Sequence, residues 1–390
     1  MAYIYRIVNY RISQSSQFYT KNANFAPLKS QCMQNIFKHY INNLLPIIAC
    51  ATVILSLTGC SGAGGYKPQY VSGIIWGTSY NICYNADKQG DEGKVRQTIM
   101  SAMNRVDRAA NAFDKMSETG LLNRTGRITN PSPEFLHLLD LSTAINHITG
   151  GAFEPTVGPL VDLWGFGITD TEVTPCKADI DSALTLIGMD KIKRTESDIQ
   201  MLKPGMRLDL SAIAKGYGVD CVAQALEDCN ISDYMVEIGG EVRVHGHNPN
   251  GNNWTIQIDA PVPDISGTHT RLALLQLCDA ALATSGNYRN FRYTETGKLV
   301  YHTISPITGQ PIQSDILSAT VIAQNTAVAD ALATACMVLG MEESAALISR
   351  LACSDNPYVY GAVFVTAGSD TEPFVLNPVA INPERASLHP

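Results

Sequence analysis

Tyr234-Met-Val-Glu-Ile-Gly-Gly-Glu-Val-Arg-Val-His245 is the stretch that decides the fold class. Apolar residues alternate with polar ones on both sides of Gly239-Gly240, which predicts extended chain, and the glycine pair indicates a bulge or a close backbone approach. Comparable runs predict further strands at 74–82, 254–260, 272–277, 299–304, 317–323 and 358–365. Because these runs follow one another like hairpins, we expect largely antiparallel pairing.

Helices are expected between these strands at irregular intervals. Apolar residues recur at helical spacing from Val95 to Phe113, so we predict one helix over 91–116. Ser132 is placed to begin a second helix and Gly150-Gly151 to end it. Further helices are predicted from about 210 to 229, over 327–339 and over 342–351. This arrangement predicts an α+β fold of largely antiparallel sheets packed with helices.

The first 60 residues differ in composition from the rest. They carry five basic residues and no carboxylate, since the first acidic residue of the chain is Asp87. The apolar run 44–57 is short for a membrane span but has the length of a signal-peptide core, and it ends in Leu57-Thr-Gly-Cys60, which resembles a bacterial lipobox. We therefore predict cleavage before Cys60 and lipidation of its thiol. An ordinary signal peptide or a membrane anchor is the alternative.

These features divide the chain into a signal region at 1–59, a flexible glycine-rich tether at 61–71 and one catalytic domain at 72–390. Met33 and the residues after it read as a natural start, so 1–32 are interpreted as an over-extended start. Removing the five basic residues changes the formal net charge from −8 to −8 − 5 = −13. A body this acidic argues against nucleic-acid binding through a general basic surface.

One carboxylate and one hydroxyl, Asp330 and Thr334, stand four residues apart on the expected helix over 327–339. That spacing places both on one helical face, and hard oxygens are the ligands that Mg²⁺ prefers. The flanking residues are small, so a ligand can come close to the backbone. The alternative is a buried alanine-rich helix in which a neighbouring N–H satisfies Asp330.

Three other segments carry polar groups suited to chemistry. Asp209-Leu-Ser-Ala-Ile-Ala-Lys-Gly216 leads from a short strand into a helix, whose first N–H groups favour an anion and where Lys215 adds a positive charge. Asp209 either binds a ligand or caps the helix. Ala283-Thr-Ser-Gly-Asn287 reads as a small polar turn. His302 is a candidate general base or phosphate partner at a strand end, and otherwise a structural histidine.

Eight segments, in this order, resemble the ApbE-type FAD:protein FMN transferases. They are Trp76-Gly-Thr78, Gly151-Ala-Phe-Glu-Pro-Thr-Val-Gly-Pro-Leu160, Leu163-Trp-Gly-Phe-Gly167, Asp209-Leu-Ser-Ala-Ile-Ala-Lys-Gly-Tyr217, Glu237-Ile-Gly-Gly-Glu241, Ala283-Thr-Ser-Gly-Asn-Tyr288, His302-Thr-Ile-Ser-Pro-Ile-Thr-Gly309 and Ala329-Asp-Ala-Leu-Ala-Thr334. The resemblance implies that FAD binds, that Mg²⁺ or Mn²⁺ holds its pyrophosphate, and that a Thr or Ser hydroxyl of an acceptor protein attacks the phosphorus of the FMN half and releases AMP.

The resemblance also implies roles for individual residues. Asp330, Thr334 and the Ala212 carbonyl match metal ligands, and His302 matches a histidine with an acid–base role. The positions that match FAD-binding ones are Trp76, Phe113, Ala152, Phe153, Glu154, Asp209, Lys215 and Ile304.

Three positions depart from the family pattern: Glu154, Asn287 and Ser305 stand where many members have Asp. The two acidic-to-neutral changes could weaken a second cation or alter acid–base roles. A metal-dependent FAD pyrophosphatase that releases FMN and AMP therefore stays an alternative, and a flavin-binding lipoprotein without turnover is the other one.

The lipobox and the resemblance together imply a bacterial, membrane-anchored lipoprotein that faces the periplasm or the outside of the cell. The expected acceptors are exported or membrane redox proteins, such as subunits of NADH:quinone reductase or Rnf complexes. Ser61 after the lipidated cysteine permits sorting to an outer membrane. The segment 315–320 lacks the glycine of the family's acceptor motif, so self-modification is not expected.

Overall fold

The computed structural model describes residues 66–87, 92–167, 174–262, 270–287, 291–293, 299–354 and 357–389. The expected signal region, Cys60 and residues 61–65 lie outside these ranges. The first described strand, β1 (Tyr66–Ile75), pairs from Tyr66 onward with β2 (Thr78–Asp87). Residues 66–71, which we predicted as tether, are thus part of a strand, because their backbone groups are paired in a ladder.

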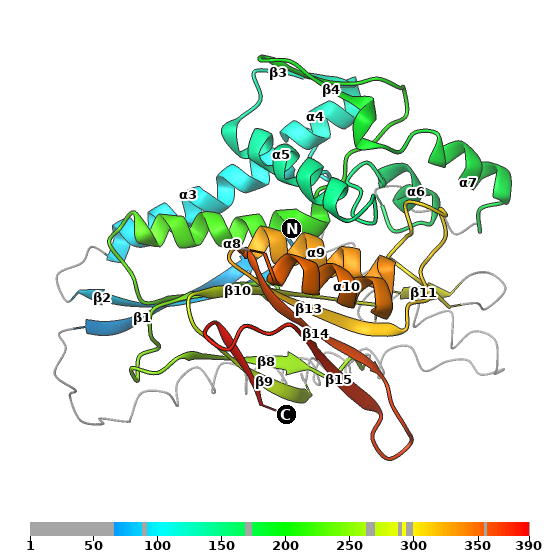
Figure 1. Ribbon diagram of the computed structural model, residues 1–390. Helices are drawn as coiled ribbons and strands as arrows, with labels where there is room; N and C mark the ends of the chain where they lie inside the picture. Colours follow the sequence, from blue (N-terminus) through cyan, green and yellow to red (C-terminus); the bar gives the residue numbers. More distant parts are fainter. Residues whose placement is uncertain are drawn as a thin grey trace, which may run out of the picture. The chain divides into compact units, whose positions relative to one another are not determined.

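An eight-stranded sheet forms the centre of the fold (Figure 1). Every neighbouring pair in it is antiparallel, which confirms the predicted α+β class. The strands, in their order across the sheet, are β1, β2, β6 (Tyr234–Ile238), β7 (Glu241–His245), β10 (Ala280–Gly286), β13 (Ile316–Ala323), β14 (Val359–Ala367) and β15 (Phe374–Val379).

Two tight turns lie side by side at one end of this sheet. The expected strand over 74–82 is instead two strands joined at Trp76-Gly77, where both residues have positive φ (49° and 76°). Gly239-Gly240 is likewise a two-residue turn (φ 64° and 100°) and not a bulge. Positive φ at both central residues matches the right-handed twist of the flanking strands. Because β2 pairs with β6, the Gly239 N–H reaches the Ser79 carbonyl at 3.0 Å.

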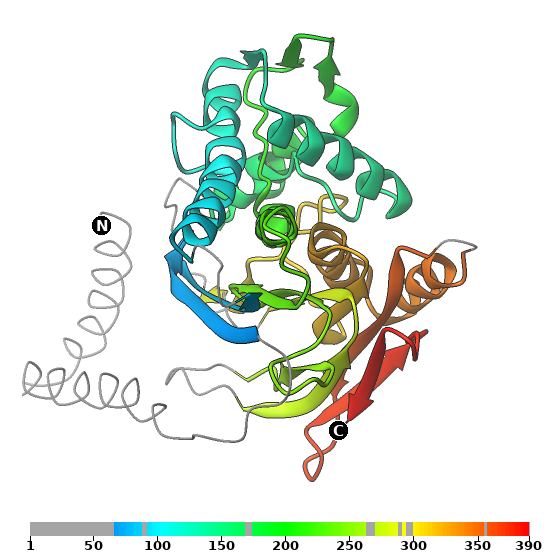
Figure 2. The same ribbon diagram turned by 90° about the vertical axis from the view of Figure 1, so that its left-hand side faces the viewer.

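Helices cover one face of the sheet. Figure 2 looks along α8 (Ser211–Glu227), with α3 (Glu92–Ala110) on one side of it, α9 (Thr326–Leu339) on the other and strands beneath. The helix predicted over 91–116 ends early, because the Asn111 side chain accepts the N–H groups of Phe113 and Asp114 and turns the chain. The remaining helices are α4 (Glu118–Thr125), α5 (Pro133–Ile148), α6 (Gly158–Leu163), α7 (Lys177–Leu184), α10 (Met341–Ala352) and the 3₁₀ turn η1 (Met189–Lys191).

The opposite face of the main sheet packs against a second sheet of three strands (Figure 1). Its strands are β8 (Trp254–Asp259), β9 (Arg271–Leu277) and β16 (Ala386–His389). In β7, Val242 and Val244 belong to this apolar layer, so Glu241 and Arg243 project to the helical side. Two smaller sheets complete the fold: β3 (Arg127–Thr129), β5 (Asp198–Met201) and β4 (Ile192–Arg194) form one, and β11 (Phe291–Tyr293) and β12 (Leu299–Tyr301) form the other.

In the described part of the chain, no helix combines the length and the apolar character needed to cross a bilayer.

Candidate functional site

The start of α9 is fixed by side chains from two elements. Asn325, the residue just before α9, is its N-cap, and the Asn325 side chain accepts the Val328 N–H at 3.3 Å. Asp220 of α8 accepts the N–H groups of Thr326 and Ala327, each at 2.9 Å. These N–H groups have no partner inside the helix, so Asp220 satisfies two of the unpaired donors of α9 and ties it to α8.

Close contact between α8 and α9 requires a glycine. A Cβ at Gly216 would lie 2.4 Å from the Thr326 carbonyl oxygen. The Gly216 N–H donates to Asp330 Oδ2 at 3.0 Å. In an α-helix the acceptor of that N–H is the carbonyl four residues earlier, at Ala212. The Asp330 carboxylate and the Ala212 carbonyl therefore lie beside the same amide.

Thr334 lies one helical turn after Asp330 on the same face of α9. Its hydroxyl is 3.2 Å from the Ser285 hydroxyl on β10. The structure thus brings together three hard oxygens from the Ala212 carbonyl, Asp330 and Thr334. We call these three residues, with Lys215, the α8–α9 site.

A second buried carboxylate, which we did not predict, adjoins this site. Glu241 at the start of β7 is 3% exposed, and its Oε1 accepts the Lys215 ammonium at 2.5 Å. Burial raises the pKa of Glu241 to about 7, against the lowering effect of Lys215 and with a further raising effect of Asp330. Burial also raises the pKa of Asp330, which Lys215 and the Gly216 N–H oppose. Two buried carboxylates share one ammonium, and this excess of negative charge fits a divalent cation.

The turn at Trp76-Gly77 lies against α8. The Trp76 indole lies over Gly218, where a Cβ would be 2.2 Å from the ring. Trp76 Nε1 is buried and has no hydrogen-bond partner among the described residues. A buried donor without a partner is costly, so this position suits a ligand that brings an acceptor and a flat ring.

The segment before α6 contacts the start of α8 through its backbone. The Asp209 N–H donates to the Pro155 carbonyl at 2.7 Å, and Asp209 Oδ1 accepts the Ser211 N–H at 2.9 Å. Glu154 accepts hydrogen bonds from the backbone and hydroxyl of Thr156 and from Asn146. Its carboxylate therefore shapes the loop on which it lies.

The other residues expected to hold FAD differ in exposure. Ala152 and Phe153 are 2% and 3% exposed and belong to the main core, and Ile304 is 5% exposed in a separate apolar cluster. Phe113 is 56% exposed on the connection between α3 and α4. Ala152, Phe153 and Ile304 are therefore buried in apolar cores, whereas the Phe113 ring is accessible at the surface.

His302 follows β12 and lies against Phe166, with 6.4 Å between ring centroids. Arg292 of β11 lies 5.7 Å from the centroid of the same Phe166 ring. The adjacent Thr303 hydroxyl donates to Asn287 Oδ1 at 2.7 Å. Since Ser285 and Asn287 are two residues apart, the end of β10 connects the Thr334 side of the site with the His302 segment.

Asn287 and Ser305, two of the positions where many family members have Asp, each accept hydrogen bonds through their side chains. Asn287 accepts from Thr303, and Ser305 Oγ accepts the N–H groups of Ile307 and Thr308 at 3.3 and 3.1 Å. An Asp at either position would accept the same hydrogen bonds. Ala283-Asn287, expected as a turn, is instead mostly the second half of β10 in the main sheet, where residues 283–286 pair with β13.

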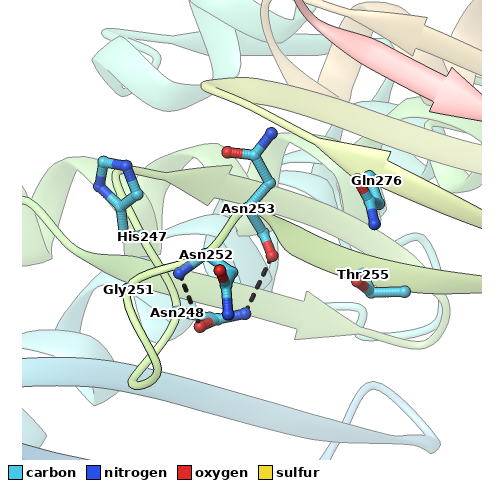
Figure 3. A pocket seen from close by; sticks show the side chains of 7 residues that line it. All are labelled: His247, Asn248, Gly251, Asn252, Asn253, Thr255 and Gln276. Carbon is cyan, nitrogen blue, oxygen red and sulfur yellow. Dashed lines mark hydrogen bonds between the residues drawn. The ribbon is translucent and has the colours of Figure 1, made fainter.

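A separate cavity of ≈ 500 Å³ lies between the β7–β8 loop and the outer surface of β8 and β9 (Figure 3). Its described lining residues are mostly polar and include no carboxylate, lysine or arginine. The Asn248 side chain is used inside the loop, where it accepts the Asn252 N–H and donates to the Asn253 carbonyl. Because β8 and β9 pack on the face of the main sheet opposite the helices, the cavity lies away from the α8–α9 site.

Comparisons with a family model and with known proteins point to the same family. The model of the ApbE family matches residues 76–354. A FAD:protein FMN transferase of Haemophilus influenzae is 34% identical over 314 residues, 78% of this chain and 89% of that protein. The corresponding protein of Vibrio cholerae is 35% identical over 308 residues, 77% and 89% of the two chains.

Solved structures show the same fold. The flavin transferase ApbE from Vibrio cholerae superposes with a TM-score of 0.70 at 30% identity and covers 81% of this chain and 98% of that one. The apo form of a Pseudomonas stutzeri flavinyl transferase ApbE gives 0.71 at 28% identity, with 82% and 96% covered.

Proposed function

The chain belongs to the ApbE family, and from this premise we propose that it is a FAD:protein FMN transferase. It moves FMN from FAD to a Thr or Ser hydroxyl of an acceptor protein and releases AMP. The observation that carries the proposal is the buried Asp330 carboxylate, which the Gly216 N–H holds beside Lys215 in a chain whose relatives bear this name. A purely structural helix would not need a buried carboxylate next to a second one.

Asp330, Thr334 and the Ala212 carbonyl are the proposed ligands of Mg²⁺ or Mn²⁺. The donor set fits, because all three atoms are hard oxygens on adjoining helices and the surrounding charge is negative. When bound, the cation supplies positive charge to the pyrophosphate of FAD.

Lys215 is the proposed protein partner of the pyrophosphate, because its side chain is 35% exposed and lies next to the proposed ligands. Trp76 provides an aromatic surface beside Gly218 of α8, and Asp209 provides a carboxylate just before the first turn of the same helix. The other residues proposed to shape the FAD pocket are Phe113, Ala152, Phe153, Glu154 and Ile304.

His302 is the proposed general base. It takes the proton from the acceptor hydroxyl as the hydroxyl oxygen forms a bond to the phosphorus of the FMN half. The bond from that phosphorus to the oxygen of the AMP phosphate breaks, and its electron pair leaves with AMP. The products are an FMN phosphoester on the acceptor and free AMP, with the proton on His302.

The proposed setting is the outer face of a bacterial membrane, with the chain anchored through a lipid on Cys60. Exported or membrane redox proteins, such as subunits of NADH:quinone reductase or Rnf complexes, are the proposed acceptors. Such proteins would be flavinylated after export.

The test incubates the purified protein with FAD, Mg²⁺ and a candidate acceptor domain, and measures intact masses. An acceptor that gains one FMN, and does not gain it with EDTA, supports the transferase. Free FMN and AMP beside an unmodified acceptor, across several acceptors, would replace it by a FAD pyrophosphatase. Bound but unchanged FAD would leave a flavin-binding lipoprotein.

A further inference from the structure

Glu241 is the most deeply buried charged group next to the α8–α9 site that the proposed chemistry does not use. Its side chain is 4% exposed. One carboxylate oxygen is bonded to the Lys215 ammonium. The other, Oε2, is buried and receives no hydrogen bond from another described residue. Burying a carboxylate with only one of its oxygens bonded costs free energy. We therefore ask what Glu241 does to the groups around it.

The strand register sets the direction of this side chain. Glu241 lies opposite Ile238 in the β6–β7 pair, so both side chains project to the same face of the sheet. Ile238 packs in the core with Val219 and Val222 of α8, so this is the face that α8 covers. Lys215 comes one residue before Gly216, whose N–H holds Asp330. The ammonium therefore interacts with two carboxylates, Glu241 from the sheet and Asp330 from α9.

We propose that Glu241 is a positioning residue that retains the Lys215 ammonium on the sheet side and so leaves the Asp330 carboxylate available to a divalent cation. The inference rests on the proposed function, because it concerns the same cation. An ammonium that moved onto Asp330 would compete with the divalent cation for that carboxylate, and the two positively charged groups would repel each other. The Glu241 salt bridge opposes that movement and keeps Lys215 oriented for an anionic ligand.

Glu241 could affect the cation through Lys215 or by coordinating it directly, and a double-mutant cycle distinguishes these two effects. The probe is Mn²⁺ alone, titrated calorimetrically into the protein without FAD. The variants are Glu241→Gln, Lys215→Met and the two combined. We expect Glu241→Gln to weaken Mn²⁺ binding about tenfold, the lower end for groups that orient metal ligands. In the Lys215→Met background the same change should alter affinity by less than about twofold, because no ammonium remains to be displaced.

Glu237→Gln is the matched control. It removes one negative charge from the same β6–β7 hairpin, but Glu237 lies opposite Val242 and projects to the other face of the sheet. We expect its Mn²⁺ affinity to stay within about twofold of the unmodified protein. Glu241→Asp keeps the charge and is the second variant, for the case that the amide prevents folding. It should keep most of the affinity, within about threefold.

Each other outcome has a defined meaning. Unchanged Mn²⁺ affinity in Glu241→Gln, or a tenfold loss in Glu241→Asp, would overturn the positioning role. An equal loss with and without Lys215 would show that Glu241 acts directly on the cation and would also overturn it. If the unmodified protein bound no Mn²⁺, both this inference and the proposed cation would fail, whereas the first two outcomes leave the proposed function intact.

Discussion

Gly216→Ala tests the packing that holds the candidate site together. The new Cβ would lie 2.4 Å from the Thr326 carbonyl oxygen, and ordinary contact begins at 3.4 Å, so α8 and α9 must separate by about 3.4 − 2.4 = 1 Å. Both contacting groups are backbone, so no side chain can move aside. Alanine in a helix interior contributes about 1 kcal/mol of stability relative to glycine, whereas overpacking costs roughly 1–3 kcal/mol. We therefore expect a net loss of about 1 kcal/mol.

The effect on metal binding should be larger than the effect on stability. The Gly216 N–H holds Asp330, and the Ala212 carbonyl lies beside it, so a shift of about 1 Å misplaces two proposed ligands at once. We expect Mn²⁺ affinity to fall at least about tenfold. Urea unfolding gives the free energy of unfolding, and calorimetry gives the affinity. Ser211→Ala, at the exposed first position of the same helix, is the control and should change neither. A Gly216→Ala protein that is more stable and binds Mn²⁺ normally would refute the account of the α8–α9 contact.

Three further predictions concern single groups. Burial raises the folded-state pKa of Glu241 to about 7 from its ordinary value of 4.5, so its contribution to stability is full below about pH 4.5 and is lost as the pH rises through 7. The melting temperature of the metal-free protein should therefore fall more over this interval than that of Glu241→Gln, and equal slopes would contradict this. Asp220→Ala removes the acceptor of two α9 N–H groups and of the Arg243 guanidinium. It should lower the free energy of unfolding, measured by urea titration, by about 2–4 kcal/mol. A loss below about 0.5 kcal/mol would show that α9 does not depend on Asp220. His302→Gln should lower the single-turnover rate of FMN transfer by about 10²–10⁴-fold and leave the affinity for FAD unchanged. A variant with the normal rate would show that His302 is not the general base.

The sequence predicted those features of the fold that local chemistry determines. Alternation gave most strands, and the spacing of Asp330 and Thr334 placed two oxygens on one helical face, as the structure has them. Ser132 caps α5, and Gly150 and Gly151 follow its end with positive φ. These features depend on residues within a few positions of one another, which is why the pattern reveals them.

Features that depend on tertiary contact were missed. Tryptophan is not a turn residue, so the turn at Trp76-Gly77 could not be read from the alternation around it; it is stabilised where the indole packs on Gly218. The contact of Glu241 with Lys215 depends on the β6–β7 register and on the packing of α8, and neither is visible in the sequence. The only available signal was an acidic residue directly after the Gly239-Gly240 pair, in a strand whose polar and apolar residues alternate.

The most direct test of the central claim compares FMN transfer by the unmodified protein and by Asp330→Asn, with FAD, Mg²⁺ and an acceptor domain, by intact mass spectrometry. Asn keeps the size of the side chain and can still accept the Gly216 N–H, so the variant should fold while its carboxylate charge is gone. The account predicts an FMN-modified acceptor with the unmodified protein and none with Asp330→Asn. Equal modification by both proteins, or modification by the unmodified protein in excess EDTA, would contradict it.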